Sequence, residues 1–559
     1  MTRPRRPLTR HAVAAVVVLG LLVLSGCSTR QVQSPTPTAR GGTLRVLVDH
    51  QVGTWDPQRI DEAGVAAFAR RTFLRTLTAL APSGSGFLPG LIGDLATSTG
   101  REEDDGRLWS FTIVKDAAWQ DGRFVTCADV KYGVSRSFAR DRVAGGPTYA
   151  VDLLDIPTYN DAQGRSVSAY DGPYSGHGEA FFDRAVTCDG QVITFHLNQT
   201  RHDFGQIVST PAFAPVRKDQ DTDRTTTLSV FSSGPYMLEG VWKPGEGGRF
   251  VRNRKWISLF DPVRLAWPDV IEVEEGVATT TLVQRLVDDR GDDRNAITWA
   301  DAPAAMSQQL AAPALASRVT RPDSGVVDVL VRASSSAVLA DPAVRRAFAL
   351  ATDRGAYAAA AGSPMTPVTS ALAASMPGRP EGDPLGAPGA GEPDAARSAL
   401  AAAGVSGPVA VRVGYPAGGA SGRGVSALAA AWTRAGFTIT LVPQAVGAAT
   451  AGAADVTLIS VSAAWPSGSA VLPGLVARVG DPALAAAVVQ AAAQPQLVDR
   501  NAAWGALDAR LVTAGDVVPL AERERLLVRG SGILAYDESA LLGGLPDLAA
   551  IEVTHEDPG

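Results

Sequence analysis

The sequence predicts an α/β protein with more than one domain. Its 559 residues are 45% hydrophobic and 19% charged, which is a globular composition in a chain long enough for two or three domains. Residues 107–139 combine a strand pattern, a turn and a helix pattern, and residues 326–354 again place a strand before a helix. Strands followed closely by helices favour the α/β class.

The stretch at 107–139 predicts a strand, a turn and a capped helix. Residues 108–114 show the alternation of a half-buried strand, and Asp121-Gly122 is a turn dipeptide. Thr126 stands where an N-cap is expected, three residues before Asp129, as in a capping box. One face of the helix that follows is apolar, because it carries Val130, Val134 and Phe138.

Periodicity, cap and turn signals place the other elements. Asp341 and Pro342 form a good helix start, because the acid can cap the helix and proline fits its first turn. Residues 414–424 are glycine-rich but lack the Gly-Lys-Ser/Thr of a phosphate loop, so we expect a mobile loop there. Further helices are expected at 68–77, 341–354, 394–403, 426–435 and 501–512, and further strands at 43–48, 185–195, 326–332, 409–415, 437–442 and 455–460.

Residues 1–26 predict a targeting segment. They contain a basic start and an apolar run of about thirteen residues, which is shorter than the twenty or so that span a bilayer. The run ends at Leu24-Ser25-Gly26-Cys27, which resembles a bacterial lipobox with Cys27 as the acylated residue; the alternative is an ordinary secretory signal. Residues 27–42 are rich in Ser, Thr, Pro and Gln and predict a flexible tether.

Charge and motifs argue against several function classes. Net charge is −6, and removing the four arginines of residues 1–26 gives −6 − 4 = −10, which disfavours nucleic-acid binding. The histidines are scattered, without H-E-x-x-H, and no cysteine pair has zinc spacing. Residues 288–293 are acidic but do not fit a calcium loop. We therefore predict no catalytic residue, no metal site and no cofactor.

Cys127 and Cys188 are the cysteines that remain once Cys27 is acylated. Outside the membrane they are expected to be oxidised, which predicts a structural disulfide. Closing a loop of this size is worth ~4 kcal/mol in the chain-entropy model. The alternative is a reactive thiol at Cys127, which lies at a predicted helix start.

One long phrase and several shorter ones carry a family resemblance. Residues Trp109 to Tyr132 read W-x-F-x-I, then K-D, W and D-G, then T-x-x-D-V-x-Y. This spacing resembles the extracellular solute-binding proteins of the oligopeptide/dipeptide/nickel class, solute-binding protein family 5. Phrases near Tyr149 and Tyr174 resemble an actinobacterial-type branch. Other phrases similar to the family are Gly41-Gly42, Trp55-Asp56-Pro57, Ser233-Gly234-Pro235-Tyr236 and residues 341–354.

The resemblance implies a two-lobed periplasmic-binding-protein-like fold (type II, cluster C) with a small extra domain in the first lobe. It divides the mature chain into a first lobe at 43–325, an inserted domain at about 76–200 within it, a second lobe at 326–514 and a return to the first lobe at 515–559.

The resemblance also implies a ligand site in the cleft between the lobes. Related peptide binders often read W-x-x-D-W-P-D after a second-lobe strand, and the aspartate pairs with the ligand's ammonium. Ala464 and Ser467 stand at the two carboxylate positions here, and Trp465 remains. We expect Trp465 to line the pocket, with a core tryptophan as the alternative, and Trp55 to lie near the lobe junction.

The resemblance predicts a non-enzymatic function. The expected protein is a monomeric, lipid-anchored, extracytoplasmic substrate-binding component of an ABC importer, which passes a peptide or peptide-like solute to a membrane permease. The alternative is an exported lipoprotein of the same fold that has lost import and acts as a sensor or envelope interaction protein.

Overall fold

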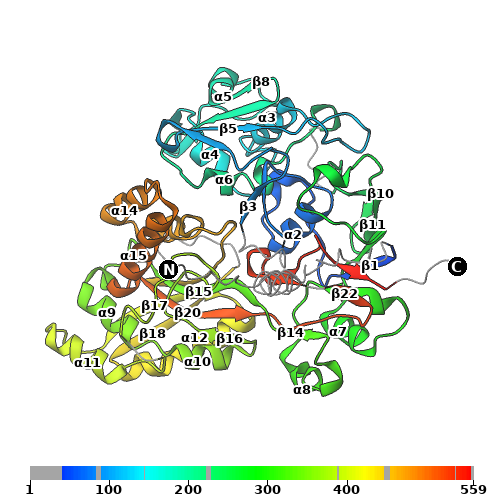
Figure 1. Ribbon diagram of the computed structural model, residues 1–559. Coiled ribbons are helices and arrows are strands. Elements are labelled where there is room, and N and C mark those ends of the chain that lie inside the picture. Colours follow the sequence, from blue (N-terminus) through cyan, green and yellow to red (C-terminus); the bar gives the residue numbers. More distant parts are fainter. Residues whose placement is uncertain are drawn as a thin grey trace, which may run out of the picture. The chain divides into compact units, whose positions relative to one another are not determined.

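The computed structural model describes residues 41–82, 90–143, 145–221, 228–386, 389–445, 454–535 and 537–554. The predicted signal at 1–26, Cys27 and the tether up to residue 40 lie outside the described residues. Residues 41–559 form one compact unit (Figure 1). Within the described ranges, no helix is long and apolar enough to cross a membrane.

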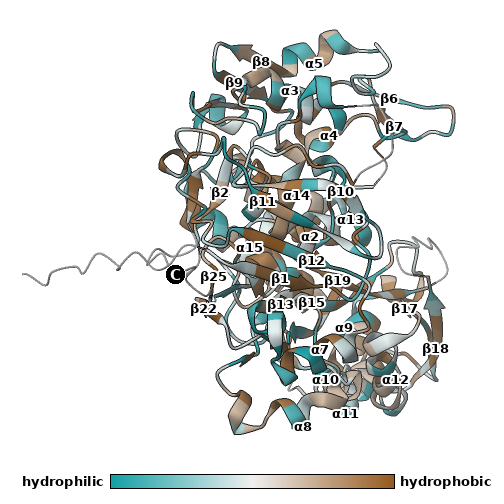
Figure 2. Ribbon diagram, turned by 90° about the vertical axis from the view of Figure 1, so that its right-hand side faces the viewer, coloured by the Kyte–Doolittle hydropathy of each residue, from teal (hydrophilic) through white to brown (hydrophobic). Residues whose placement is uncertain are grey.

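The first lobe is built on a five-stranded sheet with the order β10-β11-β12-β1-β13. Its central strands run parallel and are coloured as hydrophobic in Figure 2, as expected for strands covered on both faces. Helix α2 (Ala63–Thr72) packs into the same core, which also contains Ile551 and Val553 near the other end of the chain. The strands are β1 (Thr43–Leu47), β10 (Tyr236–Lys243), β11 (Gly247–Arg252), β12 (Val270–Glu274) and β13 (Ala296–Thr298).

The insert is a four-stranded antiparallel sheet, with the order β4-β5-β9-β8, and its helices. The predicted capping box is confirmed: the Thr126 hydroxyl accepts from the Asp129 amide, and the Asp129 carboxylate accepts from the Thr126 amide. A disulfide joins Cys127 to Cys188, so the start of α3 is tied to β8. The elements are β4 (Arg101–Glu103), β5 (Leu108–Thr112), α3 (Cys127–Arg136), α4 (Tyr149–Leu153), α5 (Glu179–Ala185), β8 (Val186–Asp189), β9 (Val192–His196) and α6 (Phe204–Ile207).

The second lobe is built on a six-stranded mixed sheet with the order β16-β20-β15-β19-β17-β18. Two hydrophobic clusters include strand residues of this sheet, one with helices α9, α10 and α12 and the other with α13 to α15. Its elements are β15 (Asp323–Arg332), α9 (Pro342–Leu350), α10 (Arg354–Ala361), β16 (Met365–Pro367), α11 (Pro393–Ala402), β17 (Val409–Pro416), α12 (Gly419–Arg434), β18 (Phe437–Gln444), β19 (Val456–Val461), α13 (Leu472–Val479), α14 (Pro482–Ala492), α15 (Leu497–Ala514) and β20 (Val517–Glu524).

Shorter elements connect these layers. They are β2 (Thr78–Leu80), β3 (Leu91–Gly93), β6 (Thr158–Asn160), β7 (Ser166–Ser168), α7 (Thr279–Asp288), α8 (Ser307–Leu310), β14 (Val319–Thr320), β21 (Leu527–Val528), β22 (Ile533–Ala535), β23 (Glu538–Ser539), β24 (Leu545–Pro546) and β25 (Glu552–Val553).

Two predictions of secondary structure were wrong, and the return to the first lobe predicted at residue 515 comes too early, because β20 pairs with β15 and β16 in the second-lobe sheet. The helix expected at 68–77 is α2, which ends at Thr72, because Asp94 binds the Arg75 side chain and the Thr76 amide outside the helix. The mobile loop expected at 414–424 is the end of β17 and the start of α12. Glycine is required within that helix at Gly424, since an added Cβ would lie 2.6 Å from the Tyr357 ring.

Candidate functional site

The loop after β19 carries three of the predicted site residues. Trp465 is only 3% exposed, and its indole Nε1 donates a 2.9 Å hydrogen bond to Ser469 Oγ. Ser467 caps the short helix η11 (Gly468–Ala470), because its hydroxyl accepts from the Ser469 amide. Ala464 is partly buried. The loop is therefore held in one conformation by its own hydrogen bonds.

Trp465 is buried against the insert as well as its own loop. Its ring meets the ring of Tyr149, on α4, with 5.0 Å between centroids and 86° between planes. Trp465 also belongs to the hydrophobic cluster of the insert, and Ala464 and Ala470 pack beside it. A second-lobe loop thus completes an apolar core that is otherwise made by the insert.

A polar contact joins the same two regions. The Ser469 hydroxyl donates to the carboxylate of Asp203, which lies 266 residues away in the sequence. Asp203 is 3% exposed and is paired with Arg201 at 3.1 Å. Burial alone would raise the pKa of Asp203, but the Arg201 cation and the hydrogen bonds from Ser469 and Arg201 lower it. The contact therefore rests on a buried, ionised acid.

Helix α2 carries a cation, Arg70, whose charge acts on Tyr149. Arg70 is half-buried, and its Nε donates at 3.3 Å to the Ala66 carbonyl of its own helix. Within the described part of the chain, no carboxylate lies at ion-pair distance from the Arg70 guanidinium. Tyr149 is among the groups that act electrostatically on Arg70.

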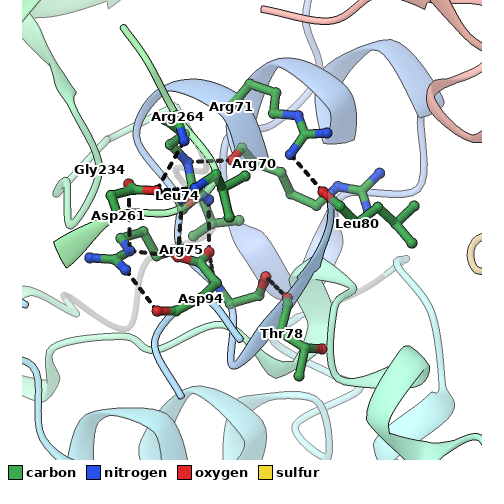
Figure 3. A network of polar contacts seen from close by, with 12 residues as sticks. Arg70, Arg71, Leu74, Arg75, Thr78, Leu80, Asp94, Gly234, Asp261 and Arg264 are labelled. Carbon is green, nitrogen blue, oxygen red and sulfur yellow. Dashed lines mark hydrogen bonds and ion pairs between the residues drawn. The ribbon is translucent and has the colours of Figure 1, made fainter. Parts of the chain in front are cut away.

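A closed network of charges fixes the end of α2 (Figure 3). Asp94 is paired with Arg75 at 2.7 Å and with Arg264 at 2.8 Å, and Arg264 also binds Asp261 at 3.1 Å. Burial would raise the pKa of Asp94, but the two arginines lower it to about 2. The Arg264 Nε also donates to the Arg70 carbonyl. This network holds the backbone of Arg70, while the Arg70 side chain runs away from it.

Trp55, the fourth predicted site residue, lies in the first-lobe core. It is 0% exposed, and its ring lies 5.0–6.0 Å from four other aromatic rings of that lobe. It also lines a cavity of about 340 Å³ together with Arg136 and Asp221. Asp56 forms an ion pair with Arg136 at 2.7 Å. The structure places Trp55 and Trp465 in different hydrophobic clusters.

The sequence reasoning missed the residues that surround Trp465. Tyr149 ends one of the phrases that resemble the family, but nothing local indicated its contact with a second-lobe loop. Asp203, Ser469 and Arg70 carried no signal, because their roles depend on partners far away in the chain. In the described ranges, no cluster of three or more His, Cys, Asp or Glu side chains could hold a metal ion.

Comparison with known proteins finds similarity to bacterial solute-binding proteins. The sequence profile described as "Bacterial extracellular solute-binding proteins, family 5 Middle" matches residues 90–481. None of the curated proteins matches the chain. The solved "Clavulanic acid biosynthesis oligopeptide binding protein 2" is 26% identical, covers 92% of this chain and 96% of its own, and superposes with a TM-score of 0.82.

More distant solved structures share the fold. The Escherichia coli murein tripeptide binding protein MppA is 19% identical, with 93% of this chain and 99% of that chain covered and a TM-score of 0.68. Haemophilus influenzae OppA, solved with the peptide RPPGFSPFR, is 15% identical, with 92% and 99% covered and a TM-score of 0.65. The two-lobed α/β fold expected from the sequence is confirmed.

Proposed function

The chain belongs to the bacterial extracellular solute-binding proteins of family 5, and on that premise we propose that it captures a peptide-like solute between its lobes and delivers it to an ABC permease. Proteins of this family bind solutes for transport and are not enzymes. The similarity to an oligopeptide binding protein supports a peptide-like ligand. Closure of two lobes around a ligand is a common way to capture solutes.

The proposal about ligand choice rests on Trp465 and on the residues beside it in the loop after β19. Trp465 packs against the Tyr149 ring, whereas Ala464 and Ser467 cannot supply a carboxylate. A buried ligand ammonium without a counter-charge is expensive, because desolvation of the charge is not offset. The proposed ligand is therefore N-blocked, cyclic or not a peptide, and free-amine di- and tripeptides bind weakly.

Calorimetry with a free-amine tripeptide and its N-acetylated form tests the proposed ligand class. We expect the acetylated form to bind more tightly, because it brings no ammonium into the cleft. Tight binding of the free form that is lost on acetylation would mean that another acid of the cleft takes the ammonium, and it would defeat this proposal. A Trp465→Ala variant serves as the control, since it should weaken binding of the acetylated form.

We further propose that Cys27 is acylated and holds the protein, as a monomer, at the outer face of the cell membrane. The support is the sequence Leu24-Ser25-Gly26-Cys27 after a short apolar run. A Cys27→Ser variant should appear in the medium instead of the membrane fraction. Unchanged membrane fractionation would exclude the lipid anchor.

A second candidate function is an exported lipoprotein of this fold that has lost import and serves as a sensor or envelope interaction protein. The residues at 464 and 467 favour it, because the carboxylates typical of peptide importers are replaced there. Native mass spectrometry of the purified mature protein separates the two candidates in part. A co-purified small solute supports capture, and a co-purified protein supports the second candidate.

A further inference from the structure

The loop at 253–266, which follows β11 in the first lobe, presents apolar side chains to water. Leu259 is 83% exposed, and no large hydrophobic side chain of the described residues is more exposed. Its neighbours Ile257 and Phe260 are 50% and 37% exposed, and Leu265 is also exposed. Single exposed hydrophobic residues are common on protein surfaces, but three of them here stand together in one short turn. We call Ile257, Leu259 and Phe260 the apolar tip.

The backbone of the apolar tip is fixed from beneath. The Phe260 amide donates to the Ile257 carbonyl at 3.1 Å, which closes the short helix η6 (Ser258–Phe260). The Phe260 carbonyl accepts from Arg75 at 3.1 Å, and the next residue, Asp261, is paired with Arg264 in the buried network of Figure 3. Buried charges therefore hold this turn in a position that leaves its apolar side chains in water.

Two cations stand directly before the apolar tip. Arg254 and Lys255 are exposed, and within the described ranges neither side chain forms an ion pair or a hydrogen bond. The acid of the loop itself, Asp261, is buried, and the exposed Asp269 is paired with Arg252 at 3.0 Å. The whole chain has a net charge of −6. An anionic surface is therefore attracted to this loop and not to the protein as a whole.

The chain enters the first lobe beside the stem of this loop. The Trp267 carbonyl accepts from the Gly41 amide at 3.1 Å and from Arg252 Nη2 at 2.8 Å, so Gly41 lies against both ends of the loop. Leu259 is seven positions after Arg252 and so at most about 25 Å from it. Gly41 lies 14 positions after Cys27, a span of at most about 50 Å. An acyl chain on Cys27 therefore confines this loop near the bilayer, where even a weak contact is made often.

We propose that the apolar tip inserts into the surface of the bilayer that holds the lipid anchor, with Arg254 and Lys255 against anionic headgroups. The inference rests on the proposed function, because it takes Cys27 to be acylated. Apolar side chains enter the boundary of the acyl chains, and cations beside them meet the lipid phosphates. This second contact fixes which side of the first lobe faces the bilayer.

A protein partner matches the apolar tip less well than a lipid surface does. A stable interface between proteins buries roughly 800 Å² on each side, contributed by about 20–30 residues. The tip offers three apolar side chains on one turn, with two cations beside them. A small apolar group next to positive charge is sufficient for a bilayer surface, because the lipids rearrange around it.

The test uses the lipidated protein in vesicles of equal phosphatidylglycerol and phosphatidylcholine. Cys127 and Cys188 are joined and Cys27 is acylated, so the thiol of a Leu259→Cys variant alone takes an environment-sensitive NBD label. This label should emit more strongly and at shorter wavelength than one on Val498→Cys, the matched control on α15 with 78% exposure. Nitroxide-bearing phosphatidylcholine should quench it several-fold more. Equal emission overturns the proposal, and so does a bright label that the lipid does not quench, because a protein then covers the tip.

A second assay separates this proposal from the lipid anchor. If the protein carries no acyl chain, the proposed attachment fails, and unlipidated protein is mixed with the same vesicles at about 5 mM lipid, because such contacts are weaker than the ~10⁴ M⁻¹ of one myristoyl chain. In sedimentation, Ile257→Ser/Leu259→Ser should bind at least about tenfold more weakly than the unsubstituted protein. Leu497→Ser/Val498→Ser, which removes side chains of 53% and 78% exposure, should bind as the unsubstituted protein does. Equal binding of the two variants, or no binding of the unsubstituted protein, overturns the proposal.

Discussion

Trp55 and Trp465 are both buried, but different parts of the molecule bury them. The rings around Trp55 all belong to the first-lobe core, among them Phe68 and Trp242. Trp465 belongs to the second lobe and is buried by Tyr149 and the insert. Burial within one lobe contributes to the stability of that lobe in every conformation. Burial between regions contributes only while those regions touch, so it also sets how easily they separate.

Two buried acids, Asp94 and Asp203, differ in the same way as the two tryptophans. Asp94 has its partners within the first lobe and insert, and its network is closed by Arg75 and Arg264. Asp203 needs Ser469, from a loop of the second lobe, to complete its set of partners. A binding protein that closes around a solute requires contacts of the second kind, because the free energy of closure must be small enough to be reversed.

The largest effect is expected from Trp55→Ala. The substitution removes a fully buried ring from a cluster of aromatic contacts and should cost about 3–5 kcal/mol of unfolding free energy. Urea unfolding followed by circular dichroism measures this. The folded variant should keep the radius of gyration of the parent in small-angle scattering, since no contact between regions is removed. A loss below about 1 kcal/mol would show that this cluster repacks around the gap.

A smaller loss of stability, but a change of conformation, is expected from Trp465→Ala. It removes the ring contact with Tyr149, and such pairs are worth ~0.5–1.5 kcal/mol beyond the area they bury. Small-angle scattering should show a larger radius of gyration for the variant without ligand, with each lobe still folded. Trp55→Ala is the matched control. If Trp465→Ala loses as much unfolding free energy as Trp55→Ala and keeps the radius of gyration of the parent, the two tryptophans do not differ in what they stabilise.

Local signals explain which parts of the fold could be predicted. The helix that starts after Thr126 was found because its cap and Asp129 lie three residues apart. The end of α2 was missed because Asp94, which binds Arg75 and Thr76, lies 19 residues beyond Arg75 in the sequence. Helices α13 and α14 were not predicted, although Leu472, Leu475, Val476 and Val479 form an apolar face on α13 and Asp481 caps α14 before Pro482.

The candidate site was predictable only in part, for the same reason. The loop with Ala464, Trp465 and Ser467 could be found because it follows a strand and resembles a known phrase. Its partners could not, because Tyr149 and Asp203 reach it from the insert through tertiary contacts. The ion pair between Arg71 and Asp547 is equally invisible in the sequence, since Asp547 lies near the other end of the chain.

The smallest expected effect concerns how the free energy of unfolding depends on pH. It compares an acid buried within one lobe with an acid shared between two regions. Asp508, on α15, is fully buried within the second lobe, where its Oδ1 accepts from the Ala371 amide at 3.0 Å. Burial raises its pKa from 3.8 to about 6, although hydrogen bonds from Ser370 and Ala371 oppose the shift. The folded protein then holds this proton more tightly than the unfolded chain, so stability from Asp508 is present below about pH 4 and is lost as pH rises to about 6.

This loss is at most about 3 kcal/mol, because each unit of pKa shift corresponds to about 1.4 kcal/mol. Asp508→Asn should flatten the dependence of unfolding free energy on pH between about 4 and 6. Asp203→Asn should act in the opposite sense, because the lowered pKa of Asp203 contributes stability that is lost as pH falls. Urea titrations across this range measure the Asp508 slope, and titrations extended below pH 4 measure the Asp203 slope, because the pKa of Asp203 is lowered from its ordinary value of 3.8. If Asp508→Asn leaves the slope unchanged, the carboxyl is hydrated in the folded protein, and the contrast between acids buried within a lobe and acids shared between regions must be drawn from Asp203 alone.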